Sequence, residues 1–345
     1  SNHWKPSLNL DQLKEEMEKL TLSVRKKLKG QDEPEDIIRI LRTIIHDEAG
    51  YGYTDQVDER GVPINPEELF LHGLLDTRKG YCMNLSLIYL ILGQKLGLPL
   101  YGVALPNHFF VRFEKGKLQI NIETTEGGVS YPDSFYQKRF GAPENNKNSY
   151  FMKNLDARKT LGAYFSNVGM VYYQNQKPEK AVFYLGLSTT INPQSIDAQN
   201  NLANIYSELN KPKKAIKHYN LALKAEPGNT STLFNLGLIL QKTGDATQAI
   251  NAFLQVVQID SGFSPAHKVL ANLYLQKNRL TSALLHLKAL VRIQPMNLQN
   301  HLNIASTYSK MGQPQLAIET LKKVQNQYPE NSEILSRNFM NFMGE

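Results

Sequence analysis

The sequence is poor in cysteine and in long apolar runs. Its only cysteine is Cys82, so no disulfide can form within the 345-residue chain, and stability must come from packing. The longest apolar run, Leu85–Leu92, contains Ser86 and is soon followed by Lys95. It is therefore well short of the ~18 residues that span a bilayer, and we expect no membrane span. The chain begins Ser-Asn-His-Trp without a methionine, which indicates a trimmed N-terminus, so cytoplasmic and exported locations both stay open.

Motifs for metals and cofactors are also missing. No glycine-rich loop of the phosphate-binding type occurs. The neighbouring residues His46, Asp47 and Glu48 diverge on a helix and make a poor metal site. We therefore expect neither a metal nor another cofactor. Six histidines without ligand spacing are interpreted as structural or surface residues: His46, His72, His218, His267, His286 and His301.

The basic excess is confined to one half of the chain. Residues 162–331 contain 16 lysines and arginines against 8 aspartates and glutamates, whereas the remainder contains 23 against 24. A positive field of this kind favours an acidic partner, although charge also serves solubility. The lysines lack the interleaved aromatic residues of a single-strand platform, and no DNA-reading motif is present. We therefore expect no nucleic-acid binding.

The same half of the chain repeats with a period of 34 residues. Four positions keep one class of residue from repeat to repeat. They are Ala181, Ala215, Ala249, Ala283 and Ala317; Pro193, Pro227, Pro295 and Pro329, with Ser261 in the third repeat; Tyr172, Tyr206, Leu240, Tyr274 and Tyr308; and Gly169, Ala203, Gly237, Ala271 and Ala305. The period predicts five repeats: 162–195, 196–229, 230–263, 264–297 and 298–331.

The repeated residues are those that two short antiparallel helices require. A small residue lets the helices approach closely, and the larger residue one turn later fills the space beside it. The proline fixes the turn after the second helix, where its missing N–H costs nothing. The pattern resembles that of tetratricopeptide (TPR) repeats, which implies an all-α solenoid that binds a protein or peptide. Residues 332–343 are expected to form its capping helix.

An asparagine recurs on the first helix of four repeats. The positions are Asn167, Asn201, Asn235 and Asn303, with Val269 in the remaining repeat. First helices line the concave face of a TPR array, and a ladder of amides there can pair with the backbone of an extended peptide of any sequence. We therefore expect a peptide-binding groove at these residues. The competing interpretation is ordinary repeat consensus, because asparagine is common at this position in TPR repeats.

The N-terminal half places its cysteine at the start of a helix. Residues 8–47 show the apolar spacing of two helices, and the stretch 47–68, with its glycines and prolines, predicts a long loop. Gly80 then precedes an apolar periodic run that ends at Gly97, so Cys82 falls in the first helical turn. The positive end of the helix macrodipole stabilises a thiolate there. The N–H groups of that turn can bind an oxyanion.

A β-hairpin is predicted after this helix. Its parts are a first strand at 100–104, a second at 108–113, a turn signal at 114–117 and a returning strand at 118–123. If Lys115 and Gly116 are the central turn residues, His108 lies directly opposite Glu123, where the carboxylate can hold the imidazole. A one-residue slip would move Glu123 to the other face of the sheet.

These motifs together resemble the transglutaminase-like superfamily. The residues that carry the resemblance are Gly80-Tyr81-Cys82, Gly97-Leu98-Pro99, Pro106-Asn107-His108 and the acidic residue on the next strand. The resemblance covers residues 35–140 and is strongest to bacterial members that carry TPR repeats. It implies an α+β transglutaminase-like domain over residues 8–150, followed by the all-α TPR solenoid.

The resemblance also implies roles for three residues. Cys82 would be the nucleophile, His108 the general base and acid, and Glu123 the group that orients His108. Most members of the superfamily have aspartate at this third position, and glutamate is one methylene longer. Asn121 is the alternative orienting group.

Two functions are consistent with this organisation. The first is a cysteine-dependent hydrolase or acyltransferase that acts on amide or peptide bonds of a protein recruited by the repeats. The second is a non-catalytic protein-interaction scaffold. The presence of Cys82 favours the enzyme, because members of this branch often lack the cysteine. No residue distinguishes hydrolysis from transfer to an amine.

Overall fold

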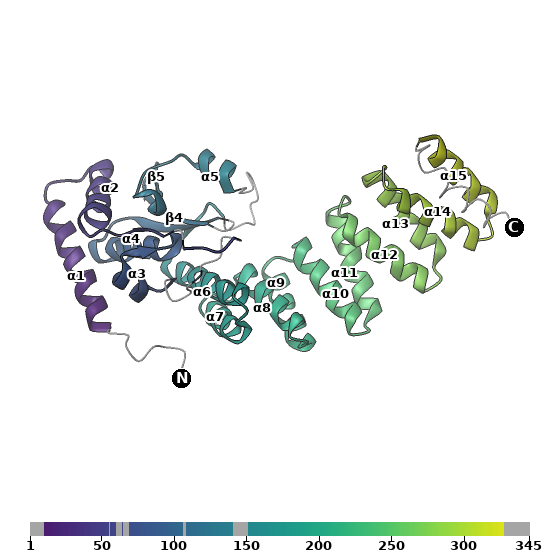
Figure 1. The fold of residues 1–345 in the computed structure, drawn as a ribbon, viewed down its shortest axis with the longest axis horizontal. Helices are drawn as coiled ribbons and strands as arrows, with labels where there is room; N and C mark the ends of the chain where they lie inside the picture. Colours follow the sequence, from purple (N-terminus) through teal and green to yellow (C-terminus); the bar gives the residue numbers. More distant parts are fainter. Residues whose placement is uncertain are drawn as a thin grey trace. The chain divides into compact units, whose positions relative to one another are not determined.

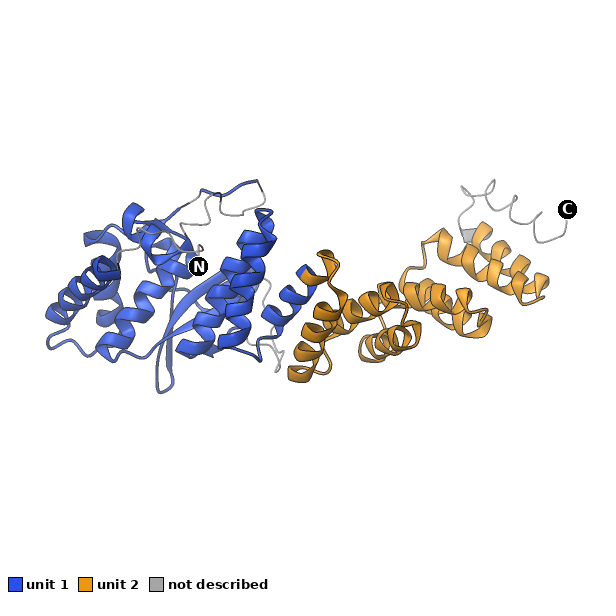
Figure 2. Cartoon of the chain, turned by 90° about the horizontal axis from the view of Figure 1, so that it is seen from below, with its two compact units in different colours: residues 1–205 blue, residues 206–345 orange. Residues whose placement is uncertain are grey.

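The fold is an α+β region followed by a series of helices, which confirms the predicted fold class (Figure 1). The computed structural model describes residues 10–54, 56–59, 64, 69–105, 108–140 and 151–327. The chain divides into two compact units, residues 1–205 and 206–345 (Figure 2). The predicted capping helix at 332–343 lies outside the described residues.

The N-terminal helices form as the apolar spacing predicts. They are α1 (Leu10–Lys27) and α2 (Pro34–Arg42), and α2 continues into the π-helix η1 (Thr43–Glu48). The stretch predicted as a long loop contains β1 (Gly52–Tyr53), which pairs in parallel with β2 (Lys79–Gly80) after α3 (Leu71–Thr77). The loop prediction was wrong for β1, because this strand depends on a partner that is distant in the sequence.

A four-stranded antiparallel sheet forms the centre of the N-terminal domain. Its strands, in spatial order, are β5 (Leu118–Ile122), β4 (His108–Lys115), β3 (Leu100–Leu105) and β6 (Asn154–Leu155). The helix α4 (Cys82–Leu96) packs against β3 and β4. A hydrophobic core fills the space between α4, the N-terminal helices and the sheet, and it includes Leu41, Leu85, Ile88, Val111 and Phe113, all fully buried. This core anchors the helix that begins with Cys82.

The β4–β5 hairpin has a different register from the predicted one. Lys115 pairs with Leu118, so Gly116 and Lys117 form the turn. Gly116 has a φ of +64°, a conformation that a residue without a Cβ adopts at little cost. The predicted turn at Lys115 and Gly116 was wrong because glycine can occupy either central position of a two-residue turn.

This shift changes which residues face His108. The predicted pairing of His108 directly opposite Glu123 was wrong by two residues. Side chains alternate along a strand, so a shift of two keeps His108 and Glu123 on the same face, now as diagonal neighbours. Asn121 shares that face but lies opposite Arg112, whose Nε donates to Asn121 Oδ1 at 2.7 Å. The alternative orienting group is therefore bound elsewhere.

The first repeat packs against the sheet domain inside the first compact unit. Its helices are α6 (Ala157–Gln174) and α7 (Pro178–Ile191), and α6 contacts β3 and β6. The Tyr164 hydroxyl donates to the carbonyl of Leu69 at 3.1 Å. The ring of Phe70 lies 6.4 Å from Tyr164 and 5.6 Å from Tyr184, measured between centroids. The structure thus joins the first repeat to the domain that carries Cys82.

The other repeats continue as helical hairpins. Their helices are α8 (Ile196–Glu208), α9 (Pro212–Ala225), α10 (Thr230–Lys242), α11 (Ala246–Ile259), α12 (Ser264–Gln276), α13 (Leu280–Ile293), α14 (Leu298–Lys310) and α15 (Pro314–Gln327). In the second unit α10 packs against α11, α12 against α13 and α14 against α15. The alanines that recur with the 34-residue period, Ala181, Ala215, Ala249, Ala283 and Ala317, are all completely buried. Close helix packing is the physical reason that each repeat keeps a small residue there.

Candidate active site

Cys82 is the first residue of α4 and is partly exposed. The backbone N–H of the N-cap residue Tyr81 donates to Asn84 Oδ1 at 2.8 Å. A Cβ on Gly80 would lie only 2.5 Å from that same oxygen, so glycine leaves room for the cap. The Gly-Tyr-Cys sequence therefore sets where the helix begins. N–H groups of a first turn have no carbonyl partner within their helix, which makes them available beside the thiol.

His108 and Glu123 form a buried pair. His108 opens β4, and its Nε2 is 2.8 Å from Glu123 Oε2. The other carboxylate oxygen accepts hydrogen bonds from the backbone N–H and the hydroxyl of Thr125, at 3.1 and 2.6 Å. The His108 side chain is 9% exposed and that of Glu123 is 2% exposed. Both carboxylate oxygens are thus engaged, which holds the longer glutamate side chain in one position.

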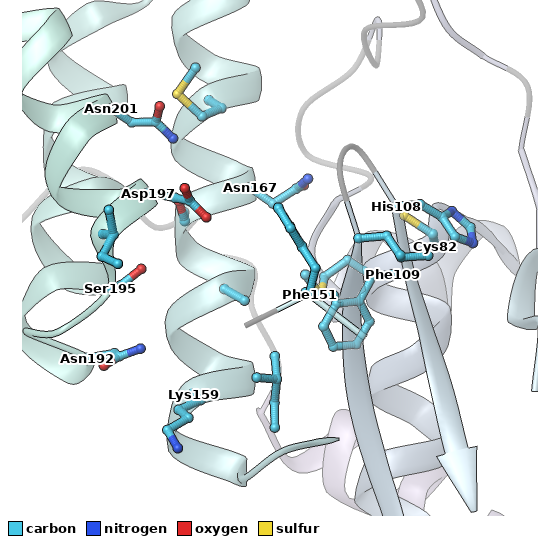
Figure 3. Close-up of a pocket in the computed structure, with 18 of the residues that line it drawn as sticks. Cys82, His108, Phe109, Phe151, Lys159, Asn167, Asn192, Ser195, Asp197 and Asn201 are labelled. Atoms are coloured by element: carbon cyan, nitrogen blue, oxygen red, sulfur yellow. The ribbon is translucent and has the colours of Figure 1, made fainter. Parts of the chain in front are cut away.

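The thiol of Cys82 completes this arrangement. His108 is hydrogen-bonded to Cys82, and Figure 3 shows the sulfur beside the imidazole ring. Because Nε2 faces Glu123, Nδ1 is the ring nitrogen that remains for Cys82. The structure therefore brings the three predicted site residues together in one place.

His108 and Glu123 each shift the pKa of the other toward its charged form. Burial acts to lower the pKa of His108, but hydrogen bonds to Cys82 and Glu123, together with electrostatic interactions with both side chains, raise it to about 9. Burial acts in the opposite sense on Glu123, yet its bonds to His108 and Thr125 hold the pKa of this carboxyl below its usual value. At neutral pH the site therefore holds an imidazolium between a carboxylate and the thiol group.

A pair of buried hydroxyls links the helix that begins with Cys82 to the end of β5. Thr124 and Ser86 are both 0% exposed, and their hydroxyl oxygens are 3.0 Å apart. The Thr124 hydroxyl also lies 3.4 Å from the carbonyl oxygen of Cys82. Thr124 directly follows Glu123, so these contacts fix the Glu123 carboxylate relative to Cys82. Sequence reasoning missed both residues, and the only available signal was the position of Thr124 beside Glu123.

A cavity of about 420 Å³ opens beside Cys82 and His108 (Figure 3). The wall from the N-terminal domain is mainly apolar and includes Leu105, Phe109 and Phe151. The opposite wall comes from α6, the α7–α8 turn and α8, and it is mainly polar. Its lining residues include Ser166, Asn167, Asn192, Ser195, Asp197 and Asn201. Two of the predicted peptide-binding asparagines, Asn167 and Asn201, therefore line the same cavity as the cysteine.

The other two predicted asparagines lie in the second compact unit. Asn235 and Asn303 are partly exposed and belong to α10 and α14. Gln299 Nε2 donates to Asn303 Oδ1 at 2.9 Å, one turn away on the same helix. These two residues are not part of the lining of the cavity at Cys82.

Two kinds of site are absent from the part of the chain that the structure describes. No group of three or more histidine, cysteine, aspartate or glutamate side chains is arranged to hold a metal ion there. Within the same residues, none of the helices has the length and apolar character that crossing a membrane requires.

Comparison with protein families identifies both parts of the chain. Residues 11–162 match the transglutaminase-like superfamily, and residues 196–229, 240–299 and 299–331 match models of the tetratricopeptide repeat. The chain therefore carries a transglutaminase-like domain followed by tetratricopeptide repeats. This combination supports a protein-interaction role for the repeats.

Individual relatives are more distant. F-box only protein 21 of Mus musculus and that of Homo sapiens are each 33% identical over 79 residues, which is 22% of this chain and 13% of each relative. The match thus spans about an eighth of the length of these curated relatives. Among solved structures, YrrB, a TPR protein with an unusual peptide-binding site, is 19% identical with a TM-score of 0.42, covering 50% of this chain and 88% of its own. MamA from Desulfovibrio magneticus RS-1 is 16% identical with a TM-score of 0.42, covering 50% and 95%.

Proposed function

We propose that the chain is a cysteine-dependent hydrolase or acyltransferase that acts on amide bonds of a protein bound by its repeats. The observation that carries the proposal is the shared cavity, which contains Cys82 and His108 together with Asn167 and Asn201. Side-chain amides can hold the backbone of an extended peptide. A peptide held in this way would present one of its carbonyl groups to the thiol, and such positioning lowers the entropic barrier of the reaction.

The first half of the proposed reaction forms a thioester. Cys82 Sγ, as a thiolate, attacks the carbonyl carbon of the amide, and the oxyanion that forms is stabilised by first-turn N–H groups of α4. The C–N bond then breaks while the His108 imidazolium gives its proton to the departing amine. The product amine leaves, and His108 is now neutral.

The second half regenerates the enzyme. Water or a second amine attacks the thioester, and neutral His108 takes a proton from the attacking group. The C–S bond breaks, and Cys82 leaves as a thiolate beside the restored imidazolium. Glu123 remains ionised throughout and keeps the imidazole ring oriented. Attack by water makes the protein a hydrolase, and attack by an amine makes it an acyltransferase.

The proposed partner is an acidic protein or peptide. The repeats carry 16 basic against 8 acidic residues, and a positive field raises the local concentration of negatively charged partners. The role does not involve nucleic acid. Binding should therefore weaken as salt screens these charges.

A proteome-derived peptide mixture tests the catalytic proposal. The full chain is incubated with the mixture, and mass spectrometry searches for new termini, deamidated side chains and amine conjugates. We expect the wild type to form one such class of product, and Cys82→Ala and His108→Ala each to lower it by at least about a hundredfold. Equal product from wild type and Cys82→Ala would reject the enzyme and leave the interaction scaffold.

The substrate-binding part of the proposal is tested separately. The double change Asn167→Ala with Asn201→Ala removes the amides that face the cavity but leaves Cys82 in place. We expect KM to rise for many peptide sequences, because backbone contacts do not discriminate between side chains. The rate of Cys82 alkylation by iodoacetamide serves as the control, because it requires no peptide. An unchanged KM would show that the asparagines are only repeat consensus.

A further inference from the structure

The imidazole of His108 has a third contact that the proposed chemistry does not use. The ring of Phe140, the last residue of α5 (Asp133–Phe140), is stacked on it. The ring centroids are 4.2 Å apart, and the ring planes differ by 2°. This is a parallel stack at van der Waals distance on a ring that is only 9% exposed.

The contact opposes the rotations by which the imidazole could leave its hydrogen bonds. Glu123 holds Nε2, and Cys82 is bonded to the same ring. Rotation about the Cα–Cβ or Cβ–Cγ bond of His108 would swing both ring nitrogens away from these partners and would push a face of the ring out of its present plane. A flat ring packed against that face opposes this rotation and keeps water from it. The direction in which Nδ1 points at the sulfur therefore depends on the stack.

The helix that carries Phe140 is itself held firmly. Residues 133, 136 and 140 share one face of α5, because their spacing matches the helical repeat. Asp133 Oδ1 accepts a hydrogen bond from Arg112 Nη2 at 2.7 Å, and Arg112 is only 3% exposed. Tyr136, which is fully buried, stacks on Phe110 with 4.0 Å between centroids. An ion pair at its start and an aromatic stack at its middle thus fix α5 over the strand that begins with His108.

We propose that Phe140 is a positioning residue for His108, whose stacked ring sets the plane of the imidazole between Cys82 and Glu123. The inference rests on the proposed function, because it assigns Phe140 to the proton transfer between His108 and Cys82. The contribution of Phe140 comes from the shape of its ring. An apolar side chain of similar size without a flat face would fill the space without setting the plane.

The rate of alkylation of Cys82 by iodoacetamide tests this inference. Cys82 is the only cysteine, so every thiol adduct on the full chain reports on this one site. The rate is measured by mass spectrometry between about pH 5 and pH 10 for Phe140→Leu, Phe140→Ala and Phe140→Tyr. We expect the leucine and alanine variants to react about tenfold more slowly at pH 7, with the profile moved to higher pH. Phe140→Tyr should retain the wild-type profile.

Phe135→Ala is the matched control. Phe135 lies on the same helix and stacks on Tyr131, with 4.1 Å between centroids. We expect its loss to leave the profile unchanged, while circular dichroism shows which variants are folded. A wild-type profile in folded Phe140→Leu would overturn the inference. An equal change in Phe135→Ala would also overturn it, because it would assign the effect to general packing of α5.

His108→Ala separates this inference from the proposed function. If His108→Ala leaves the alkylation profile unchanged, the Cys82–His108 pair fails, and the proposed function fails with it. If His108→Ala slows alkylation but Phe140→Leu does not, only the role of Phe140 is lost.

Discussion

The transglutaminase-like domain and the repeats each bury a histidine, and their surroundings move its pKa in opposite directions. Burial acts to lower the pKa of His108, but Cys82 and Glu123 raise it to about 9. His286 lies between the helices of a repeat, with its Nδ1 3.0 Å from Nδ1 of His267. Burial and the neighbouring imidazole both lower its pKa, to about 4.

The difference shows that the charge of the partner, and not burial, decides the protonation state. Both side chains are removed from water, which disfavours the charged form of each. Cys82 and the Glu123 carboxylate together reverse this tendency at His108, whereas a second imidazole adds to it at His286. The stability from the charged His108 is present below its unfolded pKa of about 6.5 and is lost as the pH rises through about 9. The stability from neutral His286 is present above about 6.5 and is lost as the pH falls toward about 4.

Removing the carboxylate should make the environment of His108 resemble that of His286. In Glu123→Gln the buried imidazole keeps a polar partner but loses the negative charge. We expect the pKa of His108 to fall well below about 9, because only Cys82 then opposes the effect of burial. An NMR titration of the histidine ring protons measures it directly.

Glu126→Gln is the matched control for this change. Glu126 is three residues further along, is 37% exposed and pairs with Arg139 at 2.8 Å. The charge of Glu126 also acts on His108, but Glu126 is not hydrogen-bonded to the ring, so we expect the pKa of His108 to stay much closer to 9 than in Glu123→Gln. A value near 9 in Glu123→Gln as well would contradict the role given to Glu123.

Acid should weaken the repeats through His286. Between about pH 6.5 and pH 4 the imidazole of His286 becomes protonated in the unfolded chain but stays neutral in the folded protein. The free energy of unfolding therefore falls by about 2–3 kcal/mol over this range. Denaturant unfolding at pH 7 and at pH 4.5 measures this loss in the full chain. His286→Leu removes the titrating group. The free energy of unfolding of this variant should therefore fall by about 2–3 kcal/mol less on acidification than that of the wild type. Equal losses in variant and wild type would disprove the assignment.

His46 is a third, partly buried histidine with which to test the comparison of His108 and His286, and its replacement should have the smallest effect on stability. It lies in the same domain as His108, but Nδ1 faces the carbonyl oxygen of Tyr51 at 2.7 Å and Nε2 faces the hydroxyl of Tyr89 at 2.9 Å. Burial lowers the pKa of His46, so its NMR titration should resemble that of His286 and not that of His108. His46→Phe should cost about 1 kcal/mol of unfolding free energy, because it removes two hydrogen bonds. A charged His46 at neutral pH would show that the domain, and not the partner, sets the protonation state.

The repeats were predictable because their packing depends on residues that are close in the sequence. Each alanine of the 34-residue ladder is buried and recurs at a fixed spacing, so Ala215 and Ala283 reveal the period without knowledge of any distant partner. The start of α4 was predictable for the same reason, because Gly80 and the apolar run after Cys82 are local signals.

The geometry of the site was harder to predict from the sequence than the repeats were. The hairpin register was predicted two residues away from its observed position, because the choice between Lys115-Gly116 and Gly116-Lys117 as the turn cannot be made locally. His108 and Glu123 still meet, because a shift of two residues preserves the face of a strand. Phe140 was missed, since its contact with His108 joins elements that are distant in the sequence.

The order of domains, the repeat period and the position of Cys82 at a helix start all follow from patterns between near neighbours along the chain. The three-dimensional fold was needed for the rest: the diagonal placement of Glu123, the stack of Phe140 and the wall that the first repeat contributes to the cavity at Cys82. The physical reason is that these features come from packing between distant segments. Such packing depends on the shapes of whole elements, and no short sequence pattern encodes it.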